Sequence, residues 1–386
     1  MSSRLILAID TSCDETSAAV TDGRRVLSNV ISSQIMIHKN YGGVFPALAK
    51  RAHEEKIDYV VNEALRRASI VLGHFKNRHT QIYNLQFTIY KQFQISNFKF
   101  QIDAIAVTQG PGLAIALEVG IKKAKQLSVD ASLPLVAINH LEGHIYSCLG
   151  ENSKGLPHRE IIFPALCLIV SGGHTELVLM HEHQTYEVIG ATLDDACGEA
   201  LDKAAKILKL GYPGGPVIEK LAEQAFQNFK FQISRFDREA RRANFKFSTP
   251  LKEKTNLSFS YSGLKTQLLY TVEKMTDQDL GKNLTSLAFS FQDACFEQII
   301  RKTSQAIKVY QPKTLVCGGG VIANKYLRRC LRRLAKKNNL PILFPPYKNL
   351  ITDNAAMIGI AAYYKMRRKE FVKDLGKLDR EPRMEL

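Results

Sequence analysis

The chain has 386 residues, of which 45% are hydrophobic and 23% are charged, and its formal net charge is +16. This length and composition predict a globular, enzyme-sized protein with room for two packed domains. The first apolar run, Leu5–Ile9, is too short for a signal peptide or a membrane span, so we expect a cytoplasmic protein with no membrane partner. The seven cysteines are dispersed and form no Cys-x-x-Cys pair, which argues against a disulfide framework and a thiolate zinc site.

The surplus of positive charge raises affinity for phosphate backbones. It leaves two interpretations open, a nucleic-acid partner or a solvated surface. The basic residues cluster at 122–123, 238–242, 328–329, 332–333, 336–337 and 367–369.

Strands and helices alternate along both halves of the chain. In the first half, strands are predicted at 5–10, 17–20, 102–107 and 134–138, and helices at 45–68 and from 112 to about 128. In the second half, strands are predicted at 166–170, 176–180 and 314–317, and helices at 194–208, 286–309 and from Asn324 onward. This alternation predicts an α/β fold made of two related halves.

The predicted domains follow from this repeat. An N-terminal domain spans 1–150, a C-terminal domain spans 151–352, and 353–386 supplies a C-terminal helix that packs back toward the first domain, followed by a basic tail. Two segments interrupt the pattern, at about 75–101 and 226–248, because near-copies of Asn-Phe-Lys-Phe recur there outside any structural period. We interpret them as surface insertions, whose aromatic and lysine residues either stack on bases or form extra edge strands.

Two histidines four residues apart, His140 and His144, are the most informative local feature. On a helix they share one face and can bind one metal ion, although surface or hydrogen-bonded histidines show the same spacing. Zinc peptidases place a glutamate directly after the first histidine. Here Glu142 follows by two positions, about 200° round the helix at ~100° per residue, which disfavours a peptidase.

Three loops are suited to a nucleotide. The turns at 10–16 and 171–175 occupy equivalent places in the two halves, and glycines and small hydroxyl side chains let backbone N–H groups approach phosphates. Paired turns of this kind can clasp the phosphates of a nucleotide between two domains. The third loop, 318–324, provides backbone against which an adenosine can lie before a helix begins.

These features together resemble the tRNA threonylcarbamoyladenosine transferase family, TsaD. The resemblance covers nearly the whole chain outside the insertions and the tail. It implies an α/β fold of the actin and sugar-kinase type (ASKHA), with two domains and the active cleft between them. The matching segments are Asp10–Thr16, Tyr41–Pro46, Gly110–Leu113, Asn139–His144, Val170–Thr175, Asp194–Lys203, Tyr212–Pro216, Phe259–Thr266, Gly318–Asn324 and Thr352–Gly359.

The resemblance also implies the site residues. The metal ligands would be His140, His144 and Asp353, holding one divalent ion, with Fe²⁺ expected and Zn²⁺ as the alternative. Asp14 and Glu15 would orient the attacking amine or the phosphates, unless they are solvated turn carboxylates. The residues implied to bind the adenylate are Ile169, Val170, Ser171, Gly172, Gly173, Asp202, Gly215, Glu219 and Asn324.

The implied activity is transfer of the threonylcarbamoyl group from threonylcarbamoyl-AMP to N6 of adenosine 37 of tRNAs that read ANN codons. The implied partners are tRNA, threonylcarbamoyl-AMP and the accessory proteins of the bacterial complex, a TsaB-like paralogue and a TsaE-like ATPase. Two alternatives remain, a small-molecule O-carbamoyltransferase and a non-catalytic partner subunit of the same fold. A metallopeptidase is the least favoured interpretation.

Overall fold

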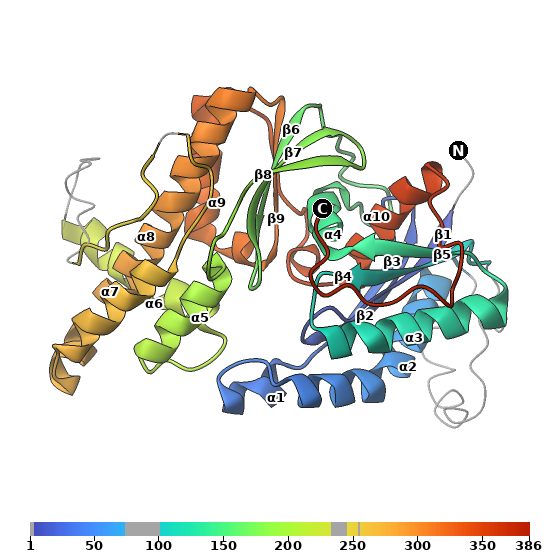
Figure 1. Ribbon diagram of the computed structural model, residues 1–386, viewed down its shortest axis with the longest axis horizontal. Coiled ribbons are helices and arrows are strands. Elements are labelled where there is room, and N and C mark those ends of the chain that lie inside the picture. Colours follow the sequence, from blue (N-terminus) through green and yellow to red (C-terminus); the bar gives the residue numbers. More distant parts are fainter. Residues whose placement is uncertain (1–3, 74–100, 233–244, 254) are drawn as a thin grey trace. The chain divides into compact units, whose positions relative to one another are not determined.

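The computed structural model describes residues 4–73, 101–232, 245–253 and 255–386. The chain divides into two compact units (Figure 1). Unit 1 combines Met1–Ile37, Val44–Glu160 and Pro345–Leu386, and unit 2 combines His38–Gly43 and Ile161–Phe344. The predicted insertion at 75–101 and most of the one at 226–248 lie outside the described residues.

Unit 1 contains a five-stranded sheet with the order β3-β2-β1-β4-β5. The pairs β1–β2 and β2–β3 are antiparallel, whereas β1–β4 and β4–β5 are parallel. Its strands are β1 (Leu5–Asp10), β2 (Glu15–Asp22), β3 (Arg25–Ser33), β4 (Ala104–Gly110) and β5 (Leu135–Asn139).

Unit 2 repeats this topology. Its sheet has the order β8-β7-β6-β9-β10, again with two antiparallel pairs followed by two parallel ones. The strands are β6 (Ala165–Val170), β7 (Thr175–Glu182), β8 (Thr185–Ala191), β9 (Thr314–Gly318) and β10 (Ile342–Leu343). The prediction of two related α/β halves is therefore confirmed, and with it the actin and sugar-kinase type of fold.

Successive side chains of each strand in the first sheet point to opposite faces, so both faces are apolar and helices cover both. Leu7 and Ile9 belong to the core shared with α2 and α3, whereas a Cβ atom at Gly359 of α10 would lie 3.3 Å from Ala8. The helices of this unit are α2 (Pro46–Val71), α3 (Ala114–Ala131), α4 (His140–Tyr146) and α10 (Ala355–Arg367), with short turns η3 (Ser147–Leu149) and η6 (Lys348–Leu350). The short helix α1 (Ile35–His38) and η1 (Lys39–Tyr41) lie where the chain passes between the units.

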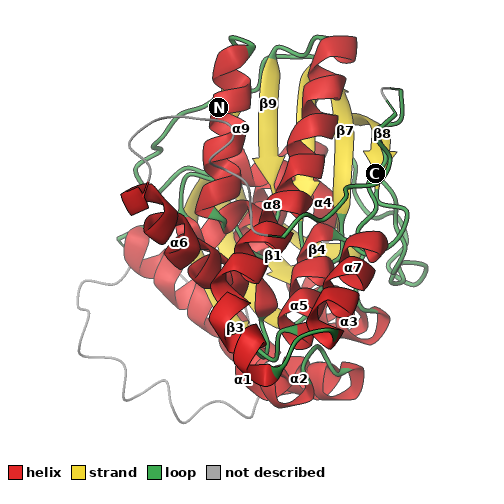
Figure 2. Cartoon of the chain, turned by 90° about the vertical axis from the view of Figure 1, so that its left-hand side faces the viewer, coloured by secondary structure: helices red, strands yellow, loops and turns green. Residues whose placement is uncertain are grey.

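In unit 2, helices α8 and α9 lie along one face of the sheet (Figure 2). A continuous core joins β6 and β9 to α5, α8 and α9. The helices are α5 (Cys197–Ile207), α6 (Gly214–Gln232), α7 (Ser262–Glu273), α8 (Asp277–Tyr310) and α9 (Lys325–Lys337), and η5 (Gly320–Ala323) precedes α9. Among the described residues, no helix is long and apolar enough to cross a membrane.

The repeated Asn-Phe-Lys-Phe segments do not behave as predicted where they can be seen. The second copy begins inside α6, so this part is helical and not an edge strand. In the third copy, Phe245 and Phe247 pack against the core of unit 2, and Phe247 forms an edge-to-face contact with Phe291. These two rings are therefore used in packing and are not displayed for base stacking.

Candidate functional site

The two histidines lie on the short helix α4, which follows β5 directly. Asn139 caps its start, because the Asn139 Oδ1 atom accepts a hydrogen bond from the backbone N–H of Leu141. The Nδ2 atom of Asn139 donates to the carbonyl oxygen of Glu385, so the C-terminal segment also holds the capping side chain in place. His140 and His144 are both buried, on a helix as predicted.

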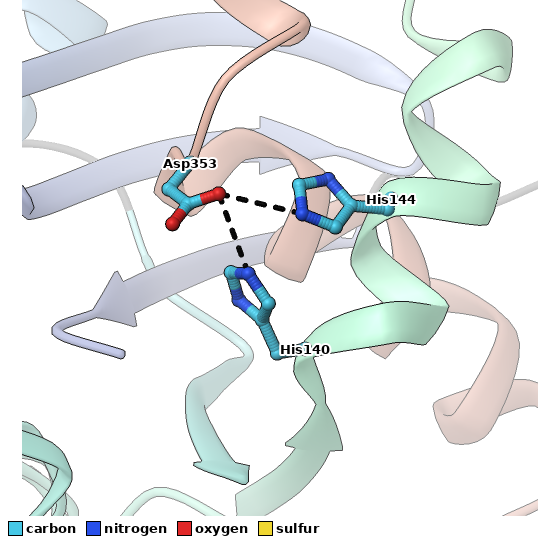
Figure 3. Close-up of side chains that lie close together, drawn as sticks. All are labelled: His140, His144 and Asp353. Atoms are coloured by element: carbon cyan, nitrogen blue, oxygen red, sulfur yellow. Dashed lines mark ion pairs between the residues drawn. The ribbon is translucent and has the colours of Figure 1, made fainter. Parts of the chain in front are cut away.

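Asp353 comes from the far end of the sequence and reaches the same point. It directly precedes Asn354, whose Oδ1 atom caps α10 by accepting from the backbone N–H of Met357. The Asp353 Oδ1 atom lies 3.4 Å from His140 Nε2 and 3.3 Å from His144 Nε2 (Figure 3). One ligand atom from each residue lies within 4.8 Å of the others. All three belong to unit 1.

This group could bind a metal ion. Separations of 3.3–3.4 Å are those expected between neighbouring ligands of an ion bound at ~2.1 Å. Among the described residues, neither ring nitrogen of His144 makes a hydrogen bond of normal geometry, although the residue is fully buried. Buried nitrogens without such a partner are costly unless something else binds them. Two imidazoles and one carboxylate also leave further coordination positions open.

The electrostatics of the group point the same way. Burial disfavours the charged form of His140, but Asp353 and Asp10 outweigh it and raise its pKa to about 10. Burial and the charge on His140 lower the pKa of His144. Burial also acts on Asp353, yet the two imidazoles hold the pKa of Asp353 well below its ordinary value. In this group the positive charge of protonated His140 therefore compensates the negative charge of the Asp353 carboxylate. A metal cation would have to displace that proton from His140.

Asp10 was missed as a site residue. It ends β1 fully buried, and its Oδ2 atom lies 3.6 Å from His140 Nδ1. Its other oxygen accepts a hydrogen bond from the backbone N–H of Ser12. A carboxylate behind a ligating imidazole fixes the orientation of the ring. The signal in the sequence was an acid that closes an otherwise apolar strand.

Glu142 points away from the two histidines, as predicted. Its Oε2 atom lies 3.0 Å from the Nζ atom of Lys365 in α10, with both side chains largely buried. Glu142 is therefore not placed to polarise a water molecule on the ligand group. This geometry counts against the peptidase interpretation.

The turn after β1 lies beside the same group. Asp14 is buried and Glu15 is half-buried. Burial first, and then the negative charges of Asp14, Asp353 and Asp10, hold the pKa of Glu15 well above its ordinary value. His53 braces this turn, since its Nδ1 atom lies 2.8 Å from Thr16 Oγ1 and its Nε2 atom lies 3.0 Å from the Cys13 carbonyl oxygen.

The equivalent turn of unit 2, after β6, leaves Gly172 and Gly173 exposed. Two close backbone approaches shape it. A Cβ atom at Gly198, in the first turn of α5, would lie 2.5 Å from the Ser171 carbonyl oxygen. Gly319 has φ +94°, and a Cβ atom there would lie 2.4 Å from the Val170 carbonyl oxygen. The strand end that contains Ile169 and Val170 is thus in contact with the loop that leads to Asn324.

The remaining predicted adenylate residues adjoin these loops in unit 2. Asp202 Oδ1 accepts from the backbone N–H groups of Gly214 and Gly215 at 2.7 and 3.3 Å. Glu219 Oε1 accepts from the backbone N–H of Lys325 at 2.8 Å. The Asn324 side chain caps α9. These side-chain oxygens therefore organise helix starts, which is a structural use that the sequence did not reveal.

Comparison with known proteins agrees with this arrangement. Residues 25–77 and 77–360 match the family model "TsaD: tRNA N6-adenosine threonylcarbamoyltransferase". A protein of that name from Thermosipho africanus is 40% identical over 370 residues, covering 96% of both chains. Another from Bacillus subtilis is 40% identical over 358 residues, covering 92% of this chain and 89% of its own.

Solved structures are similar at a lower level. The crystal structure of T. kodakarensis HypF superposes on this chain with a TM-score of 0.49 and 12% sequence identity. The alignment covers 97% of this chain and 48% of the HypF chain. Assignment rests on the sequence matches, which cover most of this chain and most of each relative. The chain therefore belongs to the TsaD family, the tRNA N6-adenosine threonylcarbamoyltransferases.

Proposed function

We propose that this tRNA N6-adenosine threonylcarbamoyltransferase takes its acyl group from threonylcarbamoyl-AMP and delivers it to adenosine 37 of tRNAs that read ANN codons. N6 attacks the carbamoyl carbon, the bond from that carbon to the phosphate oxygen breaks, AMP leaves, and the amine loses one proton. The observation that carries the proposal is the convergence of His140, His144 and Asp353 in a chain 40% identical to transferases of this name.

His140, His144 and Asp353 are the proposed metal ligands. A bound divalent ion would supply Lewis-acid polarisation of a carbamoyl or phosphate oxygen. We infer Fe²⁺, because two imidazoles with one carboxylate form the ligand set of many ferrous sites, and Zn²⁺ accepts the same ligands. Asp10 would hold His140 in place from behind.

The loops of unit 2 are the proposed donor site. The exposed Gly172 and Gly173 allow close approach of an anionic phosphate to backbone N–H groups. Residues 169–173, Asp202, Gly215, Glu219 and Asn324 adjoin one another there. Their main contribution to the rate would be to position the activated donor, because its mixed anhydride needs little further activation.

Asp14 and Glu15 are the proposed groups that orient the amine and receive its proton. A carboxyl group whose pKa is raised from its ordinary value is a stronger base than a free carboxylate. The raised pKa of Glu15, caused first by burial and then by neighbouring carboxylates, fits that role.

We further propose that the protein works in the cytoplasm with a TsaB-like paralogue and a TsaE-like ATPase. The basis is membership of the family, and the structure contains this chain alone. The two alternatives, a small-molecule O-carbamoyltransferase and a non-catalytic partner, lose support because full-length relatives bear the transferase name and the ligand group is intact.

Reconstitution tests the proposal. The purified protein is combined with tRNA, threonine, bicarbonate, ATP, an adenylate-forming enzyme and the accessory proteins, and the tRNA nucleosides are analysed by mass spectrometry. The expected product is threonylcarbamoyladenosine, and its absence with every component active would refute the proposal. His140→Ala should abolish the product, whereas His181→Ala, on the exposed end of β7, should not.

A further inference from the structure

The exposed face of α9 carries an uncompensated positive charge. This helix contains seven basic residues and no acidic one. Leu327, Leu331 and Leu334 form its buried face. The side chains in its second half that face solvent are all cationic: Arg332, Arg333, Lys336 and Lys337.

Neighbouring groups do not neutralise these cations. Within the part of the chain that the structure describes, Arg333, Lys336 and Lys337 form no ion pair with any carboxylate. The first half of the helix differs, because Lys325 and Arg329 line a small pocket together with Glu219 and Glu223 of α6. Only the second half presents free positive charge.

The charge pattern costs the helix stability. Arg329 and Arg333, Arg332 and Lys336, and Arg333 and Lys337 are like-charged pairs at i,i+4 spacing, which destabilise a helix. A face that served only solubility needs no such pattern. On α2, for example, Glu63 pairs with both Arg66 and Arg67.

We propose that the second half of α9 binds the phosphate backbone of the tRNA, outside the nucleotide that is modified. This inference rests on the proposed function, because it takes the substrate to be tRNA. α9 extends for about 20 Å, so its second half is about 10 Å long, enough for more than one phosphate contact. The helix starts at Asn324 and Lys325, beside the proposed donor residues of the same unit, and an RNA bound to the second half therefore passes within about 20 Å of that site.

A membrane surface does not fit this helix. Interfacial helices insert an apolar face between lipids, whereas the apolar face of α9 is buried in the core of unit 2. Arg332 is further held over the ring of Phe344, 5.3 Å from its centroid. An acidic protein is the remaining competitor, and the experiment separates it from RNA.

The test uses the triple variant Arg333→Gln/Lys336→Gln/Lys337→Gln. Glutamine keeps the helix propensity of these positions. The matched control, Lys206→Gln/Lys274→Gln/Lys282→Gln, removes three exposed charges elsewhere in unit 2. Affinity for unmodified tRNA is measured by fluorescence anisotropy over a range of salt concentrations, alongside donor binding, metal content and thermal melting.

We expect the α9 variant to bind tRNA at least ~10-fold more weakly and to lose about 2 from the slope of log K against log salt. Donor binding, metal content and the melting temperature should match the wild type, and saturating tRNA should restore the transfer rate. Unchanged affinity and slope would overturn the inference, as would loss of accessory-protein binding with tRNA binding intact. Failure of the wild-type protein to modify tRNA would instead count against the proposed function.

Discussion

Glu142 and Lys365 form a buried ion pair, 3.0 Å long, that joins the helix of the two imidazoles to the helix that begins beside Asp353. Lys365 also donates to the carbonyl oxygen of Ala137 in β5. The pair therefore connects the two chain segments that supply the ligands. Burial raises the pKa of Glu142 against the opposing effect of Lys365.

Removing one partner should be worse than removing both. We expect Lys365→Met to destabilise the protein by about 3 kcal/mol, because it leaves an unpaired buried carboxylate, and to weaken metal binding. Glu142→Gln/Lys365→Met should recover much of that stability. Denaturant unfolding and metal titration measure both effects, and a double variant no better than Lys365→Met would show that the pair is not coupled.

Asp10→Asn should weaken metal binding by roughly 10–100-fold, because the ring of His140 loses its supporting carboxylate. The variant should still fold, since an asparagine Oδ1 atom can accept the hydrogen bond from the Ser12 N–H. Asp22→Asn, at the far end of β2, is the matched control. Competition with a chelator gives the metal affinities. Equal metal affinities for Asp10→Asn and Asp22→Asn would show that Asp10 does not support metal binding.

Metal binding should release one proton per ion over a wide pH range. The pKa of His140 in the unloaded protein is about 10, so the unloaded form holds this proton below pH 10 and the loaded form cannot. Affinity should therefore rise about tenfold per pH unit between pH 7 and 9. Calorimetry in buffers of different ionisation enthalpy counts the protons, and a pH-independent affinity would contradict the assigned ionisation.

Gly319→Ala should damage the donor site and leave the metal site intact. A φ of +94° strains any other residue by about 1–3 kcal/mol, and the added methyl group would also overlap the Val170 carbonyl. We expect weaker binding of a non-hydrolysable adenylate with unchanged metal content, since the ligands lie in unit 1. Gly281→Ala, in the open first turns of α8, should have no such effect. Loss of metal from the Gly319 variant would mean that the sites are not independent.

Much of this fold could be predicted because buried strands leave a strong signal. β1 was predicted to the residue, and β6 to within one. The edge strands β3, β8 and β10 were not predicted, since β3 and β8 are only partly buried and β10 is two residues long. The helix predicted from Asp194 begins at Cys197 instead, because Asp194 is occupied in accepting from the backbone of Tyr261 and Ser262.

The site shows the same division. A spacing of four placed His140 and His144 on one face, which local periodicity can predict. Nothing local could pair Glu142 with Lys365, because 223 positions separate them and the contact depends on how α10 crosses the sheet. The resemblance to the family brought Asp353 into the group, and the coordinates place its carboxylate 3.3–3.4 Å from both imidazoles.

The most direct test of the central claim is metal analysis of the purified protein and of His144→Ala, combined with X-ray absorption at the metal edge and nucleoside mass spectrometry of the tRNA product. The account predicts one divalent ion per wild-type chain, bound by two imidazoles and a carboxylate, with both the ion and the modified nucleoside lost in His144→Ala. A variant that keeps its ion and its activity would contradict the assignment of His140, His144 and Asp353 as the metal site.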